Sequence, residues 1–95
     1  MSDRLSDPVN EPREHRLKRM RMRSMRRGIK EMDIILTRFA DARLDALSAQ
    51  ALDDYDALLG ENDQDLYQWV TGQVAAPARF DGIVSDIIHT ACNTK

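Results

Sequence analysis

Hydrophobic residues in the last quarter of the chain recur at spacings of three and four, which is typical of one face of an α-helix. They are Phe80, Ile83, Val84, Ile87, Ile88 and Ala91. Pro77 precedes them, and proline is favoured at the first helical position because the N–H that it lacks would have no partner there. The pattern predicts a helix that opens at Pro77.

Three more amphipathic segments precede this one. Residues 29–42 carry Ile29, Met32, Leu36 and Phe39 on one helical face, and Ile35 widens that face. Ser48 is a favourable N-cap for a helix ending near Leu59, where Gly60 follows as a stop. A short fourth helix begins after Asn62 or Asp63, which can cap it, and ends at Gly72. Its expected inward residues are Leu66, Trp69 and Val70.

The segment from Pro12 to Arg26 is rich in good helix formers but has only a thin apolar stripe, formed by Leu17, Met20 and Met25. We expect this helix to show its arginines to solvent or to a partner. Gly28 follows, and glycine tolerates a positive φ, so we expect it to close the first helix and allow a sharp turn into the second.

The expected fold is all-α, a compact bundle of five short helices in a single domain over residues 12–95. Residues 1–11 are polar and have little to bury, so we expect a disordered N-terminal extension there. Alternating Val, Ile, Thr and Tyr runs, the usual signal for strands, are absent from the sequence.

Charge is distributed unevenly although the formal net charge is only −2. Nine of the fourteen basic residues lie between Arg13 and Lys30, and ten of the sixteen acidic residues lie between Glu31 and Asp65. The basic helix leaves three interpretations open: a phosphate-binding surface for nucleic acid, a solvated face, or an arginine-rich face that binds a protein. No aromatic residue is interleaved for base stacking, which disfavours nucleic acid.

Candidate chemistry is sparse. Cys92 is the sole cysteine and lies three residues after His89. These two side chains alone are too few soft ligands for a zinc site. The acidic residues between Asp53 and Asp65 lack the spacing of a calcium loop, and the four glycines are scattered singly. We therefore expect neither an enzyme nor a tightly bound cofactor. With no apolar run long enough for a membrane span and acidic residues at the start of the chain, we expect a cytoplasmic, bacterial protein.

The central motifs resemble the succinate dehydrogenase FAD assembly factors, small flavinylation factors of bacteria and mitochondria with an Arg-Gly-x-x-Glu signature. The resemblance covers about residues 13–75. It is carried by Arg26-Arg27-Gly28 followed by Ile29-Lys30-Glu31-Met32-Asp33, by residues 44–48, by Tyr55-Asp56-Ala57-Leu58-Leu59, and by Asn62-Asp63-Gln64-Asp65-Leu66-Tyr67-Gln68-Trp69.

The resemblance implies an assembly chaperone rather than an enzyme. It implies binding to the flavoprotein subunit of succinate dehydrogenase, or of the related fumarate reductase, and promotion of covalent FAD attachment to that subunit. FAD would then sit on the partner, and we expect the chain itself to be a monomer. A regulatory, antitoxin-like protein and a nucleic-acid-binding protein acting through the basic helix are the alternatives.

The motif predicts a partner-binding surface at the junction of the first two helices. Gly28 would expose backbone, Arg27 would donate to a carboxylate and Glu31 would accept hydrogen bonds. Alternatively, Gly28 only caps a helix, and Arg27 pairs with Glu31 inside the molecule. The predicted surface consists of Arg23, Arg26, Arg27, Gly28, Lys30, Glu31 and Asp33.

Overall fold

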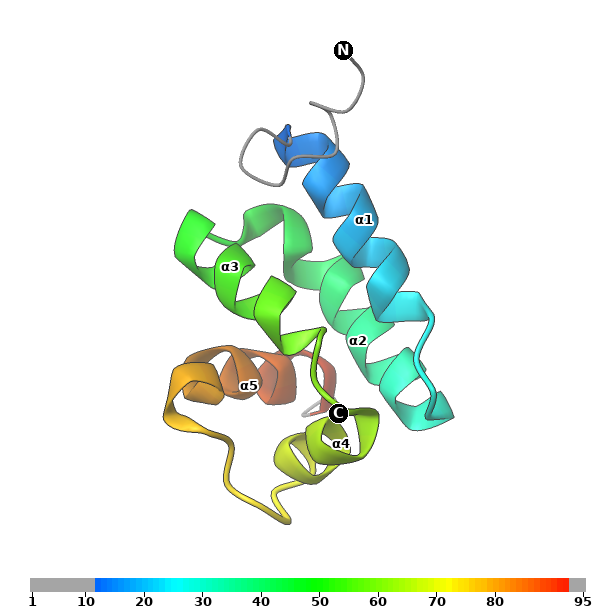
Figure 1. The fold of residues 1–95 in the computed structure, drawn as a ribbon, viewed down its shortest axis with the longest axis vertical. Helices are drawn as coiled ribbons and strands as arrows, with labels where there is room; N and C mark the ends of the chain where they lie inside the picture. Colours follow the sequence, from blue (N-terminus) through cyan, green and yellow to red (C-terminus); the bar gives the residue numbers. More distant parts are fainter. Residues whose placement is uncertain (1–11, 93–95) are drawn as a thin grey trace.

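A computed structural model describes residues 12–92, which form five α-helices with short connections (Figure 1). The helices are α1 (Arg13–Met25), α2 (Lys30–Arg43), α3 (Ala49–Leu58), α4 (Asp63–Val70) and α5 (Asp81–Ile87). No strand occurs between residues 12 and 92. The predicted all-α bundle of five short helices is confirmed, while the disorder predicted for residues 1–11 lies outside the described residues.

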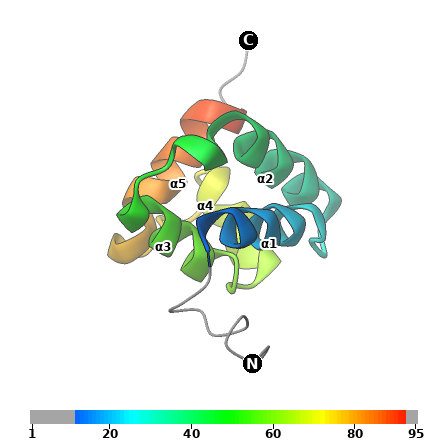
Figure 2. The ribbon, with the colours of Figure 1, turned by 90° about the horizontal axis from the view of Figure 1, so that it is seen from above.

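Helices α1 and α2 form an antiparallel hairpin along one side of the bundle (Figures 1 and 2). The buried residues of α1 are Met20 and Ser24, so α1 rests on the domain by a narrow face, as its composition predicts. Met25, predicted to belong to this face, is instead 52% exposed. Five residues rotate a helix by about 140° beyond a full turn, which carries Met25 away from the direction of Met20.

Helix α2 supplies the centre of the core. Met32, Leu36 and Phe39 are fully buried, which confirms the predicted stripe. The Phe39 ring lies 5.2 Å from that of Tyr55 on α3, measured between centroids, in a tilted arrangement favoured by aromatic pairs. A second aromatic pair, Trp69 and Phe80, joins α4 to the segment before α5 at 5.8 Å.

Local signals set the ends of α3 and α4 as expected. The Ser48 hydroxyl accepts a hydrogen bond from the Ala51 N–H, and the Asn62 side chain accepts one from the Gln64 N–H. Gly72 has a φ of +81°, the only positive φ among residues 12–92, and it follows the end of α4. A short 3-10 turn, Leu44–Ala46, links α2 to α3.

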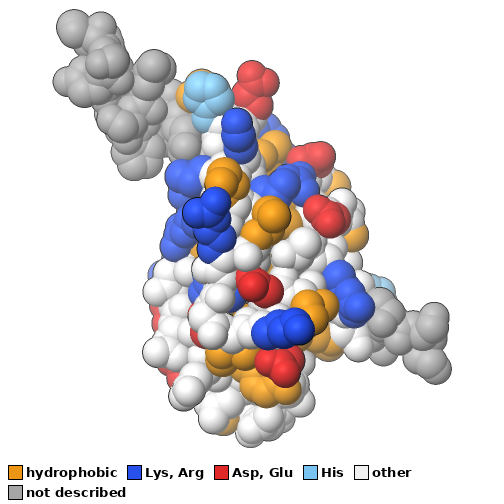
Figure 3. Space-filling model, turned by 90° about the vertical axis from the view of Figure 1, so that its right-hand side faces the viewer, with side chains coloured by type: hydrophobic (Ala, Val, Ile, Leu, Met, Phe, Trp, Pro, Cys, Tyr) orange, Lys and Arg blue, Asp and Glu red, His pale blue; other side chains and the backbone are white. Residues whose placement is uncertain are grey.

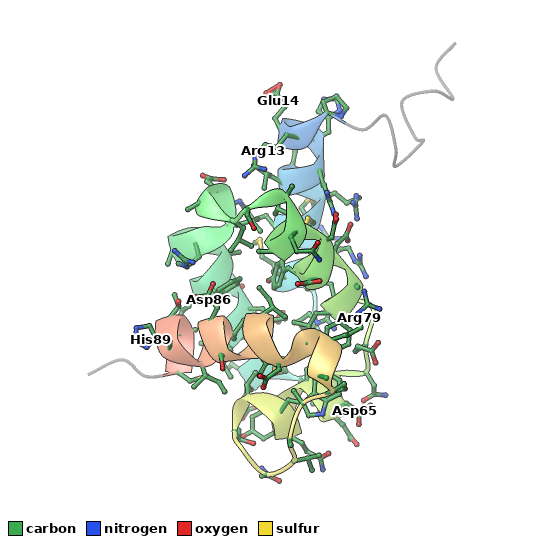
Figure 4. The ribbon with its side chains drawn as sticks, turned by 90° about the vertical axis from the view of Figure 1, so that its left-hand side faces the viewer. Arg13, Glu14, Asp65, Arg79, Asp86 and His89 are labelled. Atoms are coloured by element: carbon green, nitrogen blue, oxygen red, sulfur yellow. The ribbon has the colours of Figure 1, made fainter. Side chains whose placement is uncertain are left out.

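The last segment differs from the single helix predicted after Pro77. It consists of a 3-10 turn at Ala78–Phe80, then α5, then a π-helical turn at Ile88–Cys92. The apolar spacing of three and four residues does not distinguish these helix types, since each still turns Ile83, Ile87 and Ala91 inward. Figure 4 shows this segment on one side of the bundle, with Arg79 near its start and His89 near its end.

Candidate functional site

The α1–α2 junction is held by a single carboxylate from another part of the chain. Asp63, the first residue of α4, accepts a hydrogen bond from Arg27 Nε at its Oδ1 atom, over 2.7 Å. Its other oxygen, Oδ2, accepts the backbone N–H of Gly28. One side chain thereby ties two consecutive junction residues to the start of α4, which fixes the path of the backbone between α1 and α2.

The Arg27 guanidinium is used inside the protein. Besides Asp63, it donates to the backbone oxygens of Leu59 at 3.1 Å, Glu61 at 3.3 Å and Arg23 at 3.3 Å. Only 8% of its side chain is exposed. Arg27 therefore joins the junction to the α3–α4 loop. The prediction that Arg27 faces a partner is not met by its side chain, and its internal ion pair is with Asp63 rather than with Glu31.

Asp33 secures the same junction from the other side. Its Oδ1 accepts the backbone N–H of Arg27 over 2.8 Å. Asp33 belongs to the first turn of α2, where the helix dipole also favours a negative charge. The N–H groups of Arg27 and Gly28 are thus both satisfied by carboxylates, although this backbone lies between two helices and has no helical hydrogen bonds of its own.

Gly28 serves this junction through close packing and not through an unusual backbone angle. Its φ is not positive, so the predicted left-handed helix cap is wrong. A Cβ atom at this position would lie 3.0 Å from Asp63 Oδ2, which is tighter than ordinary van der Waals contact. The absence of a Cβ at Gly28 therefore lets the Asp63 carboxylate approach the backbone directly.

Three of the predicted site residues remain available at the surface. Arg26, Lys30 and Glu31 are exposed. None of the three makes a hydrogen bond or ion pair through its side chain to any of residues 12–92. The structure thus divides the predicted surface: Arg27, Gly28 and Asp33 hold the junction, while Arg26, Lys30 and Glu31 project from it.

A hollow of about 430 Å³ lies beside the junction. Its lining residues come from α1, the α1–α2 junction, the residue after α3 and the start of α4, and are Met22, Arg23, Arg26, Arg27, Leu59 and Asp63. Met22 is 42% exposed, which is high for a large apolar side chain. Sequence reasoning did not identify Met22 or Leu59, because the hollow forms only when α1 lies across the α3–α4 loop.

Ion pairs between arginines of α1 and Asp56 join α1 to α3. We call this cluster of Arg16, Arg19, Arg23 and Asp56 the clasp. Asp56 accepts from Arg19 in a bidentate arrangement at 3.1 and 2.9 Å and from Arg23 at 3.1 Å, and Arg16 lies 3.5 Å from it. Burial alone would raise the pKa of Asp56, but the hydrogen bond and charge of Arg19, with the charges of Arg16 and Arg23, lower it below its ordinary value. The clasp therefore stabilises the ionised carboxylate.

The remaining arginines of α1 also have partners within the molecule. Arg21 pairs with Asp41 at 3.1 Å and Asp45 at 3.4 Å, and Arg13 donates to the backbone oxygens of Asp45 and Leu47. The expectation that the arginines of this segment face solvent or a partner is therefore met only in part, since Arg13 and Arg26 are exposed but Arg13, Arg16, Arg19, Arg21 and Arg23 also have partners within the chain. For the pairs that Arg16, Arg19 and Arg23 form with α3, one sequence signal was available. Asp53 and Asp56 are three residues apart and so lie on one face of the predicted third helix.

A buried hydrogen bond joins α1 to α3 beneath this clasp. The Tyr55 and Ser24 hydroxyl oxygens lie 2.5 Å apart, and Ser24 Oγ is 2.8 Å from the Met20 carbonyl oxygen. Because Ser24 has one proton and donates it to that carbonyl, its oxygen accepts from Tyr55. Burial, partly offset by the Ser24 hydrogen bond, raises the pKa of Tyr55 to about 12. Ser24 was not identified from the sequence.

Metal-ligand clusters and membrane-spanning helices are both absent from the described residues. Between residues 12 and 92, no group of three or more His, Cys, Asp or Glu side chains is placed to hold a metal ion. None of the described helices combines the length and the apolar character that a bilayer span requires. What the junction offers is a fixed backbone that presents exposed charges of both signs next to a hollow with an apolar wall.

Residues 18–92 match the protein family described as flavinator of succinate dehydrogenase. The mitochondrial succinate dehydrogenase assembly factor 2 of Meyerozyma guilliermondii is 49% identical over 63 residues, which are 66% of this chain and 47% of that protein. The protein of that name in Candida glabrata is 43% identical over 63 residues, 66% of this chain and 41% of its own length. That of Schizosaccharomyces japonicus is 40% identical over 83 residues, 84% and 58% respectively. The chain spans about half the length of the curated relatives it matches.

The relatives contradict one expectation from the sequence. They are fungal proteins named as mitochondrial, so they contradict the prediction of a cytoplasmic, bacterial protein. That prediction rested on acidic residues near the start of the chain. Because this chain covers only about half of each relative, its first residues carry no information about targeting.

Proposed function

This chain belongs to the family of flavinators of succinate dehydrogenase, and we propose that it is an assembly factor for the flavoprotein subunit of that enzyme. In this proposal the chain binds the subunit before the complex is assembled and promotes covalent attachment of FAD to it. The same surface would serve the related flavoprotein of fumarate reductase. The observation that carries the proposal is the match over residues 18–92, which includes the whole α1–α2 junction.

We assign the contact to the exposed part of the junction. Arg26 and Lys30 would meet carboxylates of the flavoprotein, and Glu31 would accept hydrogen bonds from it. Arg23, whose side chain is 39% exposed while it pairs with Asp56, would contribute at the edge. The internal contacts of Arg27, Gly28 and Asp33 support a different task for these residues, which is to hold the contact surface in one conformation before binding. A surface fixed in advance loses less conformational entropy on association.

The proposed role is that of a binding partner and not of a catalyst. A protein that binds one conformation of the flavoprotein more tightly than others raises the population of that conformation. If the favoured conformation aligns FAD with the residue that it modifies, attachment accelerates although the bond-forming chemistry belongs to the flavoprotein. We propose accordingly that this chain holds no FAD of its own and acts as a monomer.

Internal pairing of the arginines argues against the nucleic-acid alternative. The α1 arginines at positions 13, 16, 19, 21 and 23 already donate to aspartates or carbonyl oxygens of this chain. Binding phosphates with them would require breaking those contacts. The exposed basic residues that remain on α1, α2 and the junction between them are Lys18, Arg26, Lys30 and Arg38, and no aromatic side chain is interleaved with them for base stacking.

Charge changes at the junction test the proposal. The flavoprotein subunit is incubated with FAD and each variant, and covalent flavin is measured by in-gel fluorescence after denaturing electrophoresis. Arg26→Glu and Glu31→Ala should reduce both complex formation and covalent flavin. Arg79→Glu, which makes the same charge reversal on the opposite side of the bundle, is the matched control and should leave both unchanged (Figure 4). Wild-type levels of both readouts for the two junction variants, with folding confirmed by circular dichroism, would refute the assigned surface.

A further inference from the structure

We infer that a second hollow, between the end of α1 and the outer face of α2, docks a segment of the flavoprotein in which a large apolar side chain is followed by a carboxylate. This inference rests on the proposed function and extends the contact beyond the Arg-Gly-x-x-Glu motif. The hollow has a volume of about 360 Å³ and is lined by Met25, Asp33, Ile34, Thr37 and Arg38. Apart from Asp33, none of these residues belongs to the junction surface described above.

The apolar part of the hollow is exposed to an unusual degree. Met25 is 52% exposed and Ile34 is 43% exposed. Together with Met22 they account for three of the four large hydrophobic side chains that are exposed among residues 12–92; the fourth is Val74, beyond the end of α4. Figure 3 shows hydrophobic side chains on this face with Lys and Arg side chains beside them. Exposed apolar side chains next to charged ones can meet a partner segment that carries both kinds of group.

Arg38 supplies the polar end of the hollow. It is exposed, and it makes no hydrogen bond or ion pair with any residue from 12 to 92. The arginines of α1 contrast with it, since each of Arg16, Arg19 and Arg23 has a carboxylate partner within the chain. A guanidinium beside apolar side chains binds a carboxylate well, because its planar fork donates two parallel hydrogen bonds to the two carboxylate oxygens.

The position of Asp33 limits which ligand can enter. Its Oδ1 accepts the Arg27 N–H, so the wall of this hollow is continuous with the junction and one partner can cover both. Its carboxylate also adds a negative charge to the lining that contains Arg38. This charge disfavours a row of phosphates more than a single carboxylate, which Arg38 can neutralise while the preceding apolar side chain lies between Met25 and Ile34. The chemistry thus favours an acidic and apolar protein segment over nucleic acid.

Paired substitutions in the full chain test this inference against the purified flavoprotein subunit. Ile34→Ser removes apolar surface, and Val74→Ser is its control because Val74 is similarly exposed at 46% but lies outside the hollow. Arg38→Glu reverses the charge, and Arg79→Glu is its control. We expect each hollow variant to raise the dissociation constant about tenfold, because one well-buried contact is lost. Each control should leave the dissociation constant unchanged. Arg38→Lys should fall between wild type and Arg38→Glu, because lysine keeps the charge but loses the fork.

A second measurement separates failure of the hollow from failure of the proposed function. Backbone amide spectra of the wild-type chain are recorded with the probe peptide acetyl-Ser-Leu-Glu-Asp-amide and with the control acetyl-Ser-Leu-Lys-Lys-amide. Saturable shifts around Met25, Ile34 and Arg38 with the acidic peptide alone would support the hollow even if the flavoprotein subunit failed to bind. Flavoprotein binding that Ile34→Ser and Arg38→Glu leave at the wild-type level would overturn it. Absent or evenly spread peptide shifts, or shifts at these residues produced by a DNA duplex instead, would overturn it as well.

Discussion

Arg27 and Asp63 lie 36 positions apart in the chain and form its most buried ion pair among residues 12–92, with 2.7 Å between Nε and Oδ1 and with 8% and 19% of their side chains exposed. Breaking such a pair from one side leaves the other charge without compensation. We expect Asp63→Asn to lower the free energy of unfolding by about 3 kcal/mol, measured by urea denaturation followed by circular dichroism.

Asp45→Asn is the matched control for this substitution. Asp45 pairs with Arg21 at 3.4 Å, but its side chain is 77% exposed. An ion pair in that setting contributes less than about 1 kcal/mol. Equal losses of stability in Asp63→Asn and Asp45→Asn would show that the junction is not held by Arg27 and Asp63 in the way that the structure indicates.

Gly28→Ala tests the close approach of the Asp63 carboxylate to the backbone. The added Cβ would lie 3.0 Å from Asp63 Oδ2, so either that carboxylate or the junction must shift. We expect a loss of about 1 kcal/mol in the free energy of unfolding, measured by the urea midpoint. Gly82→Ala, whose Cβ would meet nothing within 4 Å on α5, should instead be neutral or stabilise the protein by up to about 1 kcal/mol. A Gly28→Ala variant as stable as Gly82→Ala would contradict the packing argument.

The fold followed from the sequence because its signals are local. The inward positions of α2 and of the last segment depend on helical spacing, and the caps at Ser48 and Asn62 depend on residues two or three positions away. The site did not follow in the same way. The motif located the junction, but Gly28 was expected to adopt a positive φ, since nothing near it in the chain reveals that Asp63 lies against it.

The pairing partners of the α1 arginines could not be predicted from neighbouring residues in the sequence either. The charge count placed a basic helix before an acidic segment, yet whether Arg19 meets solvent, a partner or Asp56 depends on how α1 crosses α3. That crossing is set by packing around Met20 and Tyr55, residues 35 positions apart. Similarly, a hollow between helices requires side chains from several elements, and no sequence periodicity marks its lining.

Acid should weaken the clasp that Asp56 forms with the α1 arginines. The pKa of Asp56 is lowered in the folded protein from an ordinary value of 3.8, because the arginines outweigh the effect of burial. A lowered carboxyl pKa stabilises the fold fully above the pKa of the unfolded chain, and this contribution is lost as pH falls through the folded pKa. We expect Asp56→Asn to cost about 2 kcal/mol at neutral pH and progressively less below the ordinary value.

Urea midpoints of wild type and variant at a series of pH values from neutral to strongly acidic would measure that convergence. Asp54→Asn, on the same helix, makes the same change of charge, but among residues 12–92 Asp54 accepts only from Gln50, at 3.1 Å. Its difference from wild type should be small and should vary little with pH. A gap between wild type and Asp56→Asn that stays constant down to acid pH would exclude the clasp as a source of pH dependence.

Alkali should act on the hydrogen bond between Tyr55 and Ser24. Burial raises the pKa of Tyr55 from an ordinary value of 10.0 to about 12. The folded state therefore favours the protonated, neutral form of the phenol. This contribution to stability is complete below the pKa of the unfolded chain and is lost as pH rises through the pKa of the folded protein.

In a Tyr67→Phe background, Tyr55 is the sole tyrosine, and its absorbance near 295 nm should rise around pH 12. Tyr55→Phe should cost about 1 kcal/mol below pH 10, because Ser24 Oγ loses its buried donor. Ionisation at pH 10 in the folded protein would show that Tyr55 is not enclosed between α1 and α3.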